Sequence, residues 1–313
     1  MKLGSATREY VIYKQSIGMV FQTEAVILRA FTKRTGLCAP VRKITSDTVM
    51  RYLNGRGPIT RFWHRKHDAL SGFWRFAIQH GYTDWSPVPP RRPKEPMPFA
   101  PHIYTQEELR RLLSGTATYQ KKWCKLEPVT FRVILLLLYG AGLRVSEPIN
   151  LTCGDVNLSD AMLTIRLTKF YKTRHVAINP QLRRVLEDYD LNRRTKGFRR
   201  DTSEPFFTHK NGDPIKRSAI EDAFGRLRQH VGVCRQNARY QPRLHDLRHS
   251  FAVHRVIAWY RSGADVQRLL LALATHLGHV DLTATQQYLT MTPELLAEAS
   301  LRFEGYAEEV LHA

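Results

Sequence analysis

Residues 245–288 carry the polar pattern from which the architecture of this chain follows: HDLRHSFAVHRVIAWYRSGADVQRLLLALATHLGHVDLTATQQY. His245 and Arg248 are three residues apart, so on a helix they share one face. Leu277-Gly278-His279 comes later, and Tyr288 stands nine residues beyond His279. A single tyrosine in a helical segment is usually a half-buried packing residue. This pattern alone therefore does not indicate a function, and its interpretation depends on segments upstream in the sequence.

The first of these segments is an arginine next to a glycine turn. We expect a strongly apolar helix over 128–140, and Gly140 and Gly142 permit a sharp helix end and a close backbone approach. Arg144 follows at once, and Glu147 lies about one helical turn further on. An arginine beside a helix end is usually part of a surface ion pair, so this segment alone is weak evidence.

A basic hairpin is the second upstream segment. Residues 161–167 alternate with period two, and residues 175–178 can pair with them as a second strand. The expected tip, 168–174, carries the basic residues Lys169, Lys172 and Arg174. A basic tip is ordinarily solvated, so its interpretation also depends on the other segments.

Capping and turn signals predict the remaining elements of this half. Thr105 and Glu108 form a capping box ahead of a helix of about ten residues. Further along the chain we expect a helix from Asn179-Pro180 to about residue 191, a short strand at 205–208, a turn at Asn211-Gly212, and mostly helices from Arg217 onward.

A proline-rich segment, residues 86–102, divides the chain. Proline fixes φ and biases the residue before it toward extended geometry, so we expect a semi-rigid linker between a domain at 1–85 and a domain at 103–313. Residues 1–103 contain 17 basic and 6 acidic side chains, and the remainder contains 31 and 22. The smaller part is therefore much more basic per residue.

The first domain is expected to be helical, with apolar residues at helical spacing in 5–35, 45–54 and 60–80. In the last of these stretches the aromatic side chains are expected to pack in the core. The basic residues between them are the candidates for DNA contacts: Arg61, Arg65 and Lys66. His64 and His67 lack nearby ligands for a metal, so we expect them on a helix face near phosphate or solvent.

Composition limits the class of protein. The net charge is +20, which indicates a polyanionic partner, either nucleic acid or an anionic membrane. The longest apolar run, 133–139, is too short to cross a bilayer, and the start of the chain does not resemble a signal peptide. We therefore expect a protein of the reducing cytosol. The four cysteines form no CxxC pair, so neither disulfides nor a cysteine zinc site are expected.

Taken together, the segments resemble the catalytic set of the tyrosine recombinases (phage integrase family), in the order that the family has. The resemblance covers residues 103–313, and the basic helical part with its linker is similar to the family's core-binding domain. It implies a mainly α fold with a small antiparallel β-sheet, in which a SAM-like helical domain precedes a mixed α/β catalytic domain. Two departures are the 31 residues from Arg248 to His279, several more than in the commonest members, and Thr290, where many relatives have histidine.

The resemblance implies that Tyr288 is the nucleophile and forms a 3′-phosphotyrosine. Arg144 and Arg248 then bind the phosphate, because a guanidinium group matches phosphate oxygens bidentately. His245 and His279 donate to the same oxygens or assist proton transfer. Since a tyrosine has an ordinary pKa of about 10, it needs such a cationic pocket to ionise as it attacks.

The remaining groups support this reaction. A lysine on the hairpin protonates the leaving 5′ oxygen; the resemblance implies Lys169, and Lys172 is the rival. Glu147 orients Arg144 or a histidine. Lys172 and Arg174 would also line the DNA path. No metal, ATP or other cofactor is expected, because the sequence has no carboxylate cluster and no GxxxxGK[ST] segment.

The expected partner is double-stranded DNA at the recombination sites of a mobile element or plasmid. The resemblance implies a dimer on each site and a homotetramer on two sites; accessory proteins can join, and no membrane is involved. We expect a cytoplasmic location, associated with the nucleoid if the source is bacterial. The amphipathic tail, with Leu295, Leu296, Ala299 and Phe303 on one side, can pack on its own protomer or on a neighbour.

Two other functions fit part of the sequence. One is a type IB topoisomerase-like strand transferase, which uses similar chemistry without synapsis of specific sites. The other is a DNA-binding regulator without catalysis, which would tolerate loss of Tyr288. The compact basic domain and the spacing favour a recombinase over the first, and the complete set of polar residues argues against the second.

Overall fold

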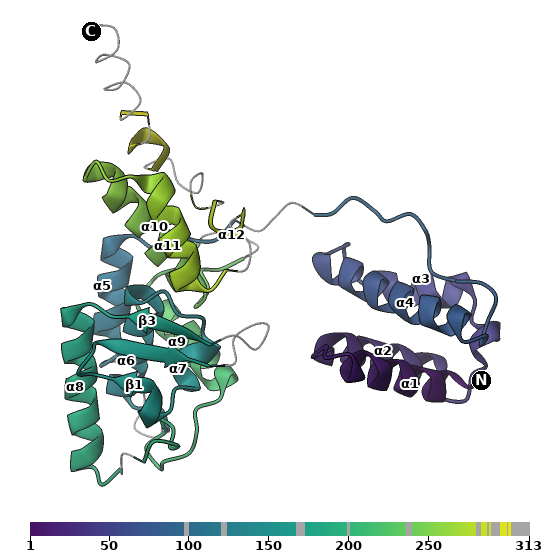
Figure 1. The fold of residues 1–313 in the computed structure, drawn as a ribbon, viewed down its shortest axis with the longest axis horizontal. Coiled ribbons are helices and arrows are strands. Elements are labelled where there is room, and N and C mark those ends of the chain that lie inside the picture. Colours follow the sequence, from purple (N-terminus) through teal and green to yellow (C-terminus); the bar gives the residue numbers. More distant parts are fainter. Residues whose placement is uncertain are drawn as a thin grey trace, which may run out of the picture. The chain divides into compact units, whose positions relative to one another are not determined.

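The computed structural model describes residues 1–96, 100–119, 124–166, 173–198, 201–235, 240–279, 283–286, 288, 295–298 and 300–301. The chain divides into two compact units, Met1–Phe99 and Ala100–Ala313 (Figure 1). The division lies inside the proline-rich segment 86–102. Within the described residues, the fold is mainly helical with a three-stranded antiparallel sheet, which confirms the predicted fold class.

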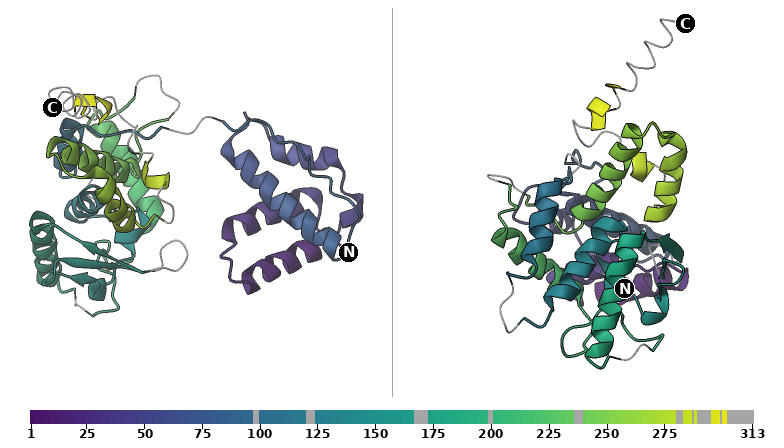
Figure 2. Two further views of the ribbon diagram at one scale, coloured as in Figure 1. Left: turned by 45° about the horizontal axis from the view of Figure 1, so that its top comes forward. Right: turned by 90° about the vertical axis from the view of Figure 1, so that its left-hand side faces the viewer.

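The described part of the first unit is helical, and its elements are α1 (Leu3–Ser16), α2 (Gln22–Thr35), the 3-10 turn Val41–Lys43, α3 (Ser46–Asn54) and α4 (Arg61–Gln79). Helices α1 and α2 lie side by side, and α4 packs against both (Figures 1 and 2). The predicted cap of α3 is confirmed, because the Thr45 hydroxyl accepts from the Thr48 amide at 3.3 Å. Phe31, Phe73 and Trp74 are fully buried and form the centre of the unit.

The helical stretch predicted over 5–35 is interrupted in the structure. Residues 17–21 separate α1 from α2, and Gly18 takes the left-handed backbone conformation with φ +82°. Ile17 and Val20, which helical periodicity assigned to the apolar face, are 53% and 50% exposed. Apolar spacing alone does not reveal this break, because Ile17 and Val20 continue the helical periodicity across the turn.

The two histidines of α4 are buried, so the expectation that they lie near phosphate or solvent is wrong. The His67 ring stacks on Trp63, with centroids 5.4 Å apart, and its Nε2 lies 2.8 Å from the Pro89 carbonyl oxygen. His64 is also buried. Val88 is buried against the same unit, so the first residues of the proline-rich segment pack on α4 rather than extending freely.

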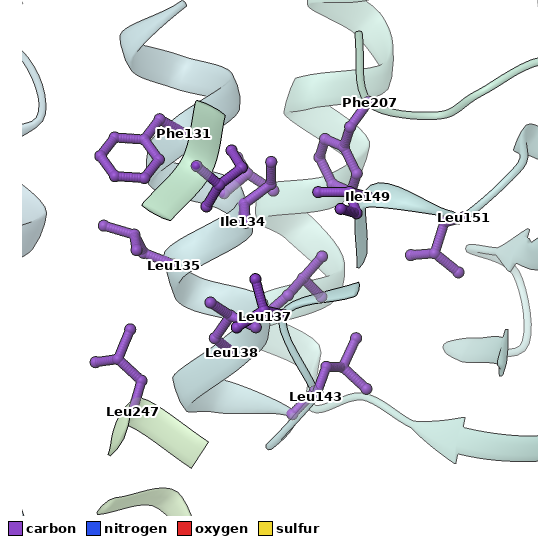
Figure 3. Close-up of a cluster of buried hydrophobic side chains, with 14 of the residues drawn as sticks. Phe131, Ile134, Leu135, Leu137, Leu138, Leu143, Ile149, Leu151, Phe207 and Leu247 are labelled. Carbon is purple, nitrogen blue, oxygen red and sulfur yellow. The ribbon is translucent and has the colours of Figure 1, made fainter. Parts of the chain in front are cut away.

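The second unit begins with α5 (Gln106–Gly115) and α6 (Pro128–Gly140). The capping box predicted ahead of α5 is confirmed, because Thr105 and Glu108 exchange hydrogen bonds at 2.9 and 3.1 Å. Helix α6 is nearly all apolar and lies at the centre of the core (Figure 3). Its central position explains why the sequence 128–140 carries no polar face.

The sheet has the order β1-β2-β3, with strands Val156–Asn157, Met162–Ile165 and Arg174–Ala177. The predicted hairpin pairing is confirmed, with Leu163 opposite Val176. The short strand β1 was not predicted. The strand predicted at 205–208 is wrong, since only isolated bridges form at Pro205 and Thr208. Phe206 and Phe207 are apolar because both side chains fill the core.

Helices form most of the rest of the second unit: α7 (Ser146–Ile149), the 3-10 turn Cys153–Asp155, α8 (Pro180–Thr195), α9 (Arg217–His230), α10 (Asp246–Arg261), α11 (Val266–Leu277) and α12 (Thr283–Gln286). Helix α8 extends four residues past the predicted end near 191. Helix α10 packs on α6 and α11, and α11 contacts β3 (Figures 1 and 2). These contacts bring the end of α6, the start of α10 and the end of α11 to one place.

The described start of the tail packs on its own unit. Residues 295–298 are helical, and Leu295 is buried in a cluster with Phe251 and Leu270, while Leu296 is 50% exposed. Glu298 pairs with Arg261 at 2.7 Å. Ala299 and Phe303 lie outside the residues that the structure describes. No helix in the described part of the chain combines the length and apolar composition that crossing a bilayer requires.

Gly142 has φ +63°, and a Cβ there would lie 2.5 Å from Phe251 Cδ1. We therefore expect Gly142→Ala to destabilise the protein by about 1–3 kcal/mol through backbone strain and overpacking against α10. Chemical denaturation measures the difference. Gly225→Ala is the matched control, because a Cβ at this helical position meets nothing within 4 Å. It should stabilise slightly, by about 0.5–1 kcal/mol. Equal stability of the two variants would contradict this account of the α6 end.

Candidate active site

Arg248 joins the ends of two helices. It lies in the first turn of α10 and is 2% exposed. Its Nη1 donates to the Gly142 carbonyl at 2.8 Å, and its Nη2 donates to the Leu277 carbonyl at 2.6 Å. The glycine turn after α6 and the end of α11 are therefore both fixed to the same guanidinium group.

Arg144 reaches the same helix end. Its Nη2 donates to the Gly278 carbonyl at 2.7 Å, and its Nη1 donates to Glu147 Oε1 at 3.0 Å. The backbone amide of Arg144 also donates to Glu147 Oε2 at 2.7 Å. Glu147 therefore holds both the backbone and the side chain of Arg144. The sequence predicts that Glu147 orients Arg144 or a histidine, and in the structure Glu147 binds Arg144.

Arg174 is a third arginine at this point. Both of its terminal nitrogens donate to Glu147 at 2.8 Å, and its Nε donates to the His276 carbonyl at 3.0 Å. Its side chain is 11% exposed. The sequence assigned Arg174 to the DNA path at a hairpin tip. In the structure it is the first residue of β3, and its described contacts are with the interior of its own unit.

The C-terminus of α11 explains why three arginines gather. The last carbonyls of a helix lack intrahelical partners and carry partial negative charge. His276, Leu277 and Gly278 each accept from a different arginine. Gly278 ends the helix in the left-handed conformation, with φ +66°, and a Cβ there would lie 3.1 Å from the Arg174 side chain. A glycine is thus needed at this position for the arginines to approach.

Charge within the cluster shifts the pKa values of its members. Burial lowers the pKa of Arg248 to about 10, and the neighbouring Arg144 charge adds to this shift. Burial alone would raise the pKa of Glu147, but the hydrogen bonds and charge of Arg174, with help from Arg144 and Arg248, hold it below its usual value. Glu147 is therefore ionised at neutral pH.

Three histidines surround the arginines and are uncharged at neutral pH. Burial, aided by the positive charge of Arg248, lowers the pKa of His245, His249 and His279 to about 4. The rings of His245 and His249 meet edge to face, with centroids 5.0 Å apart. His279 is oriented by Thr285, whose hydroxyl lies 2.7 Å from His279 Nδ1.

Tyr288 lies inside this cluster and is 1% exposed. Its hydroxyl oxygen is 3.1 Å from His249 Nδ1, and its ring lies 6.1 Å from the His279 ring. Burial raises the pKa of Tyr288, whereas the charge of Arg248, a hydrogen bond from Arg248 and the charge of Arg144 lower it. The phenol is neutral at rest, but its surroundings favour the phenolate more than burial alone would.

The structure brings most of the sequence-predicted site residues together: Arg144, Glu147, His245, Arg248, His279 and Tyr288. Lys169, Lys172 and Thr290 lie outside the described residues. Sequence reasoning missed the contacts of Arg174 and the position of His249 against Tyr288. His249 is four residues after His245, a spacing that places both on one helix face, and this signal was available.

The DNA-contact candidates of the first unit differ in their surroundings. Arg61 is exposed at the start of α4. Arg65 donates twice to Glu24 at 3.1 Å. Lys66 donates to the Tyr52 carbonyl at 2.6 Å near the end of α3, and burial lowers the pKa of Lys66. Arg65 and Lys66 thus have partners within the unit, while Arg61 faces solvent.

Among the described residues, no group of three or more histidine, cysteine, aspartate or glutamate side chains could hold a metal ion. The arrangement places guanidinium groups, which can bind an anion, next to a buried tyrosine hydroxyl.

Comparison with known proteins gives a consistent result. Residues 103–294 match the phage integrase family. The "Putative integrase/recombinase y4rB" of Sinorhizobium fredii is 39% identical over 223 residues, which cover 70% of each chain. The Tn1549 transposon integrase in complex with transposon right end DNA has a TM-score of 0.69 at 17% identity, covering 98% of this chain and 100% of that one. A lambda integrase tetramer bound to a Holliday junction has a TM-score of 0.68 at 17% identity, covering 92% and 77%.

Glu147→Gln tests the role of the buried carboxylate. We expect it to lower the free energy of unfolding at pH 7 by about 3–5 kcal/mol, because three guanidinium groups lose their shared counter-charge. The folded-state pKa of Glu147 lies below its ordinary value of 4.5. Its ionisation therefore stabilises the fold above pH 4.5, and this stabilisation is lost as the pH falls through the folded-state pKa. Urea denaturation at several pH values measures the difference between the two proteins.

Glu187→Gln is the matched control, since Glu187 pairs with Arg183 on an exposed helix face. It should cost less than about 1 kcal/mol. A Glu147→Gln effect as small as this, or one that does not shrink in acid, would contradict the role given to Glu147.

Proposed function

We propose that this chain recombines specific sites of a mobile element or plasmid through a 3′-phosphotyrosine at Tyr288. The chain belongs to the phage integrase family and is therefore a tyrosine-type DNA recombinase, which cleaves and rejoins DNA strands. The observation that carries the proposal is the convergence of Arg144, Arg248 and Tyr288 at the end of α11. A phosphodiester bound to the two arginines lies within reach of the tyrosine hydroxyl.

The arginines supply the phosphate site. Phosphoryl transfer depends mostly on positioning and on stabilising charge at the equatorial oxygens. Arg144 and Arg248 remain charged at any working pH, and their orientation is fixed by carbonyl groups and Glu147 before DNA arrives. His245 and His279 are neutral, so they act as hydrogen-bond donors to the same oxygens.

Tyr288 then attacks the phosphorus. Its oxygen bonds to the phosphate, the bond to the 5′ oxygen breaks, and a 3′-phosphotyrosine and a free 5′-hydroxyl result. The positive charge of Arg248 stabilises negative charge on the tyrosine oxygen. The energy of the phosphodiester is conserved in the intermediate, so rejoining to a second strand needs no nucleotide cofactor.

The fold relatives support the proposed partners. The lambda integrase structure is a tetramer on a Holliday junction, and the Tn1549 integrase is bound to transposon DNA. We propose the same kind of partner for this chain: duplex DNA sites, with two protomers on each site and four in the synaptic complex. The net charge of +20 fits a DNA partner.

Tyr288→Phe is expected to abolish the covalent protein–DNA adduct while DNA binding persists, because only the nucleophilic oxygen is removed. The adduct is measured by incubating the protein with a nicked suicide site, denaturing in SDS and separating the products by electrophoresis. Tyr139→Phe is the matched control, since Tyr139 is a partly buried tyrosine whose hydroxyl lies 3.0 Å from His254 Nδ1. An adduct undiminished in Tyr288→Phe would contradict the assignment of the nucleophile.

Lys169→Ala is expected to slow cleavage by about 10²–10⁴-fold, because the leaving 5′ oxygen loses its proton donor. A DNA site with a bridging 5′-phosphorothiolate at the scissile position should restore the rate, since a sulfur leaving group needs no proton. Lys172→Ala is the matched control and should cleave ordinary DNA at nearly the wild-type rate. The reverse outcome, a rescued defect in Lys172→Ala alone, would assign the acid to Lys172.

A further inference from the structure

We propose that His249 accepts the phenolic proton of Tyr288 as this hydroxyl attacks the DNA phosphate. The inference rests on the proposed function, because it takes Tyr288 as the nucleophile. It adds His249 as a catalytic residue to the site residues that the sequence predicts.

The position of His249 against the Tyr288 hydroxyl points to this role. His249 Nδ1 lies 3.1 Å from the hydroxyl oxygen. The charge of Arg248 favours a negative oxygen there. A neutral imidazole accepts a hydrogen bond at the ring nitrogen that carries no hydrogen. The proposal therefore takes Nδ1 as the acceptor and assigns the imidazole hydrogen to Nε2.

The other histidines near the site make different contacts among the described residues. His279 Nδ1 lies 2.7 Å from the Thr285 hydroxyl, and His276 Nε2 lies 2.9 Å from the Ala141 carbonyl oxygen. The His245 ring packs edge to face on His249. Thr285 thus turns one nitrogen of His279 away from Tyr288, while the Nδ1 of His249 is directed at it.

The surroundings of His249 keep it ready to accept a proton. It is uncharged at neutral pH, because burial and the positive charges of Arg248 and Arg243 outweigh the opposite effect of Asp246. The titratable and charged groups around it come from α10, the turn before it and the residues after α11: Arg243, His245, Asp246, Arg248, His279 and Tyr288. A bound phosphate anion beside Arg248 offsets positive charge and makes His249 a stronger base when DNA is present.

The Tyr288 oxygen forms a bond to phosphorus and gives its hydrogen to His249 Nδ1, which becomes an imidazolium. The bond from phosphorus to the 5′ oxygen breaks, and that oxygen takes a proton from the hairpin lysine. In rejoining, the 5′-hydroxyl attacks and returns its proton to the lysine, while the imidazolium returns its proton to the departing tyrosine oxygen.

His249→Asn tests the proposal. Asparagine places a hydrogen-bonding atom near the Nδ1 position but cannot hold a proton at working pH. We expect single-turnover adduct formation on a suicide site to slow by about 10²-fold or more, with DNA affinity and thermal stability near those of the wild type. His254→Asn is the matched control, because His254 is also on α10 and its Nδ1 lies 3.0 Å from a tyrosine hydroxyl, that of Tyr139.

A modified nucleophile and a modified DNA substrate distinguish a general base from a residue with a purely structural role. A fluorinated tyrosine at position 288 has a more acidic phenol, so it should restore much of the rate of His249→Asn. A bridging 5′-phosphorothiolate changes only the leaving group, so it should not restore the rate of His249→Asn, although it restores that of Lys169→Ala.

Each outcome decides the proposal. A slow His249→Asn protein rescued by the fluorinated tyrosine alone supports it. A rate near the wild type, rescue by the phosphorothiolate, or rescue by neither overturns it, and the last result would make His249 a positioning residue. A failure of the proposed function shows separately, because the adduct would then survive in Tyr288→Phe with His249 intact.

Discussion

One buried carboxylate and one helix end hold three arginines together, and the catalytic unit depends on this arrangement. Like charges repel by roughly 4 kcal/mol at 4 Å in a medium of effective dielectric constant 20. Glu147 offsets this repulsion by binding Arg144 and Arg174, and the last carbonyls of α11 accept from all three arginines. The site is positively charged before DNA arrives, so little reorganisation remains for the moment of reaction.

The same burial that stabilises the cluster sets its chemistry. With pKa values of about 4, the histidines are uncharged at neutral pH in the absence of DNA, so the arginines provide the positive charge of the resting site. Burial also raises the pKa of Tyr288, which keeps the proposed nucleophile protonated in the absence of DNA. Arg248 connects these roles, because it binds the α6 turn and the α11 end, and its charge lowers the pKa of Tyr288.

The sequence predicted the elements whose signals are local. The capping box at Thr105, the apolar helix over 128–140 and the pairing of the hairpin strands all appear in the structure. It did not reveal contacts that depend on distant residues. Arg174 was assigned to the DNA path from its charge, and the structure adds partners from other elements, Glu147 and His276. His67 was expected near solvent, but Pro89 and Trp63 cover it. The sequence shows which residues are basic or polar, but it does not show which distant residue will form an ion pair or hydrogen bond with them.

A crystal structure of the Tyr288→Phe protein bound to an uncleaved DNA site is the most direct test of the proposed site. We expect the scissile phosphate at the end of α11, with its non-bridging oxygens bonded to Arg144 and Arg248 and with Arg174 still bound to Glu147. The phenyl ring that replaces the Tyr288 phenol should point at the phosphorus beside His249. A scissile phosphate held by other residues, or an Arg174 that leaves Glu147 to bind DNA, would contradict it.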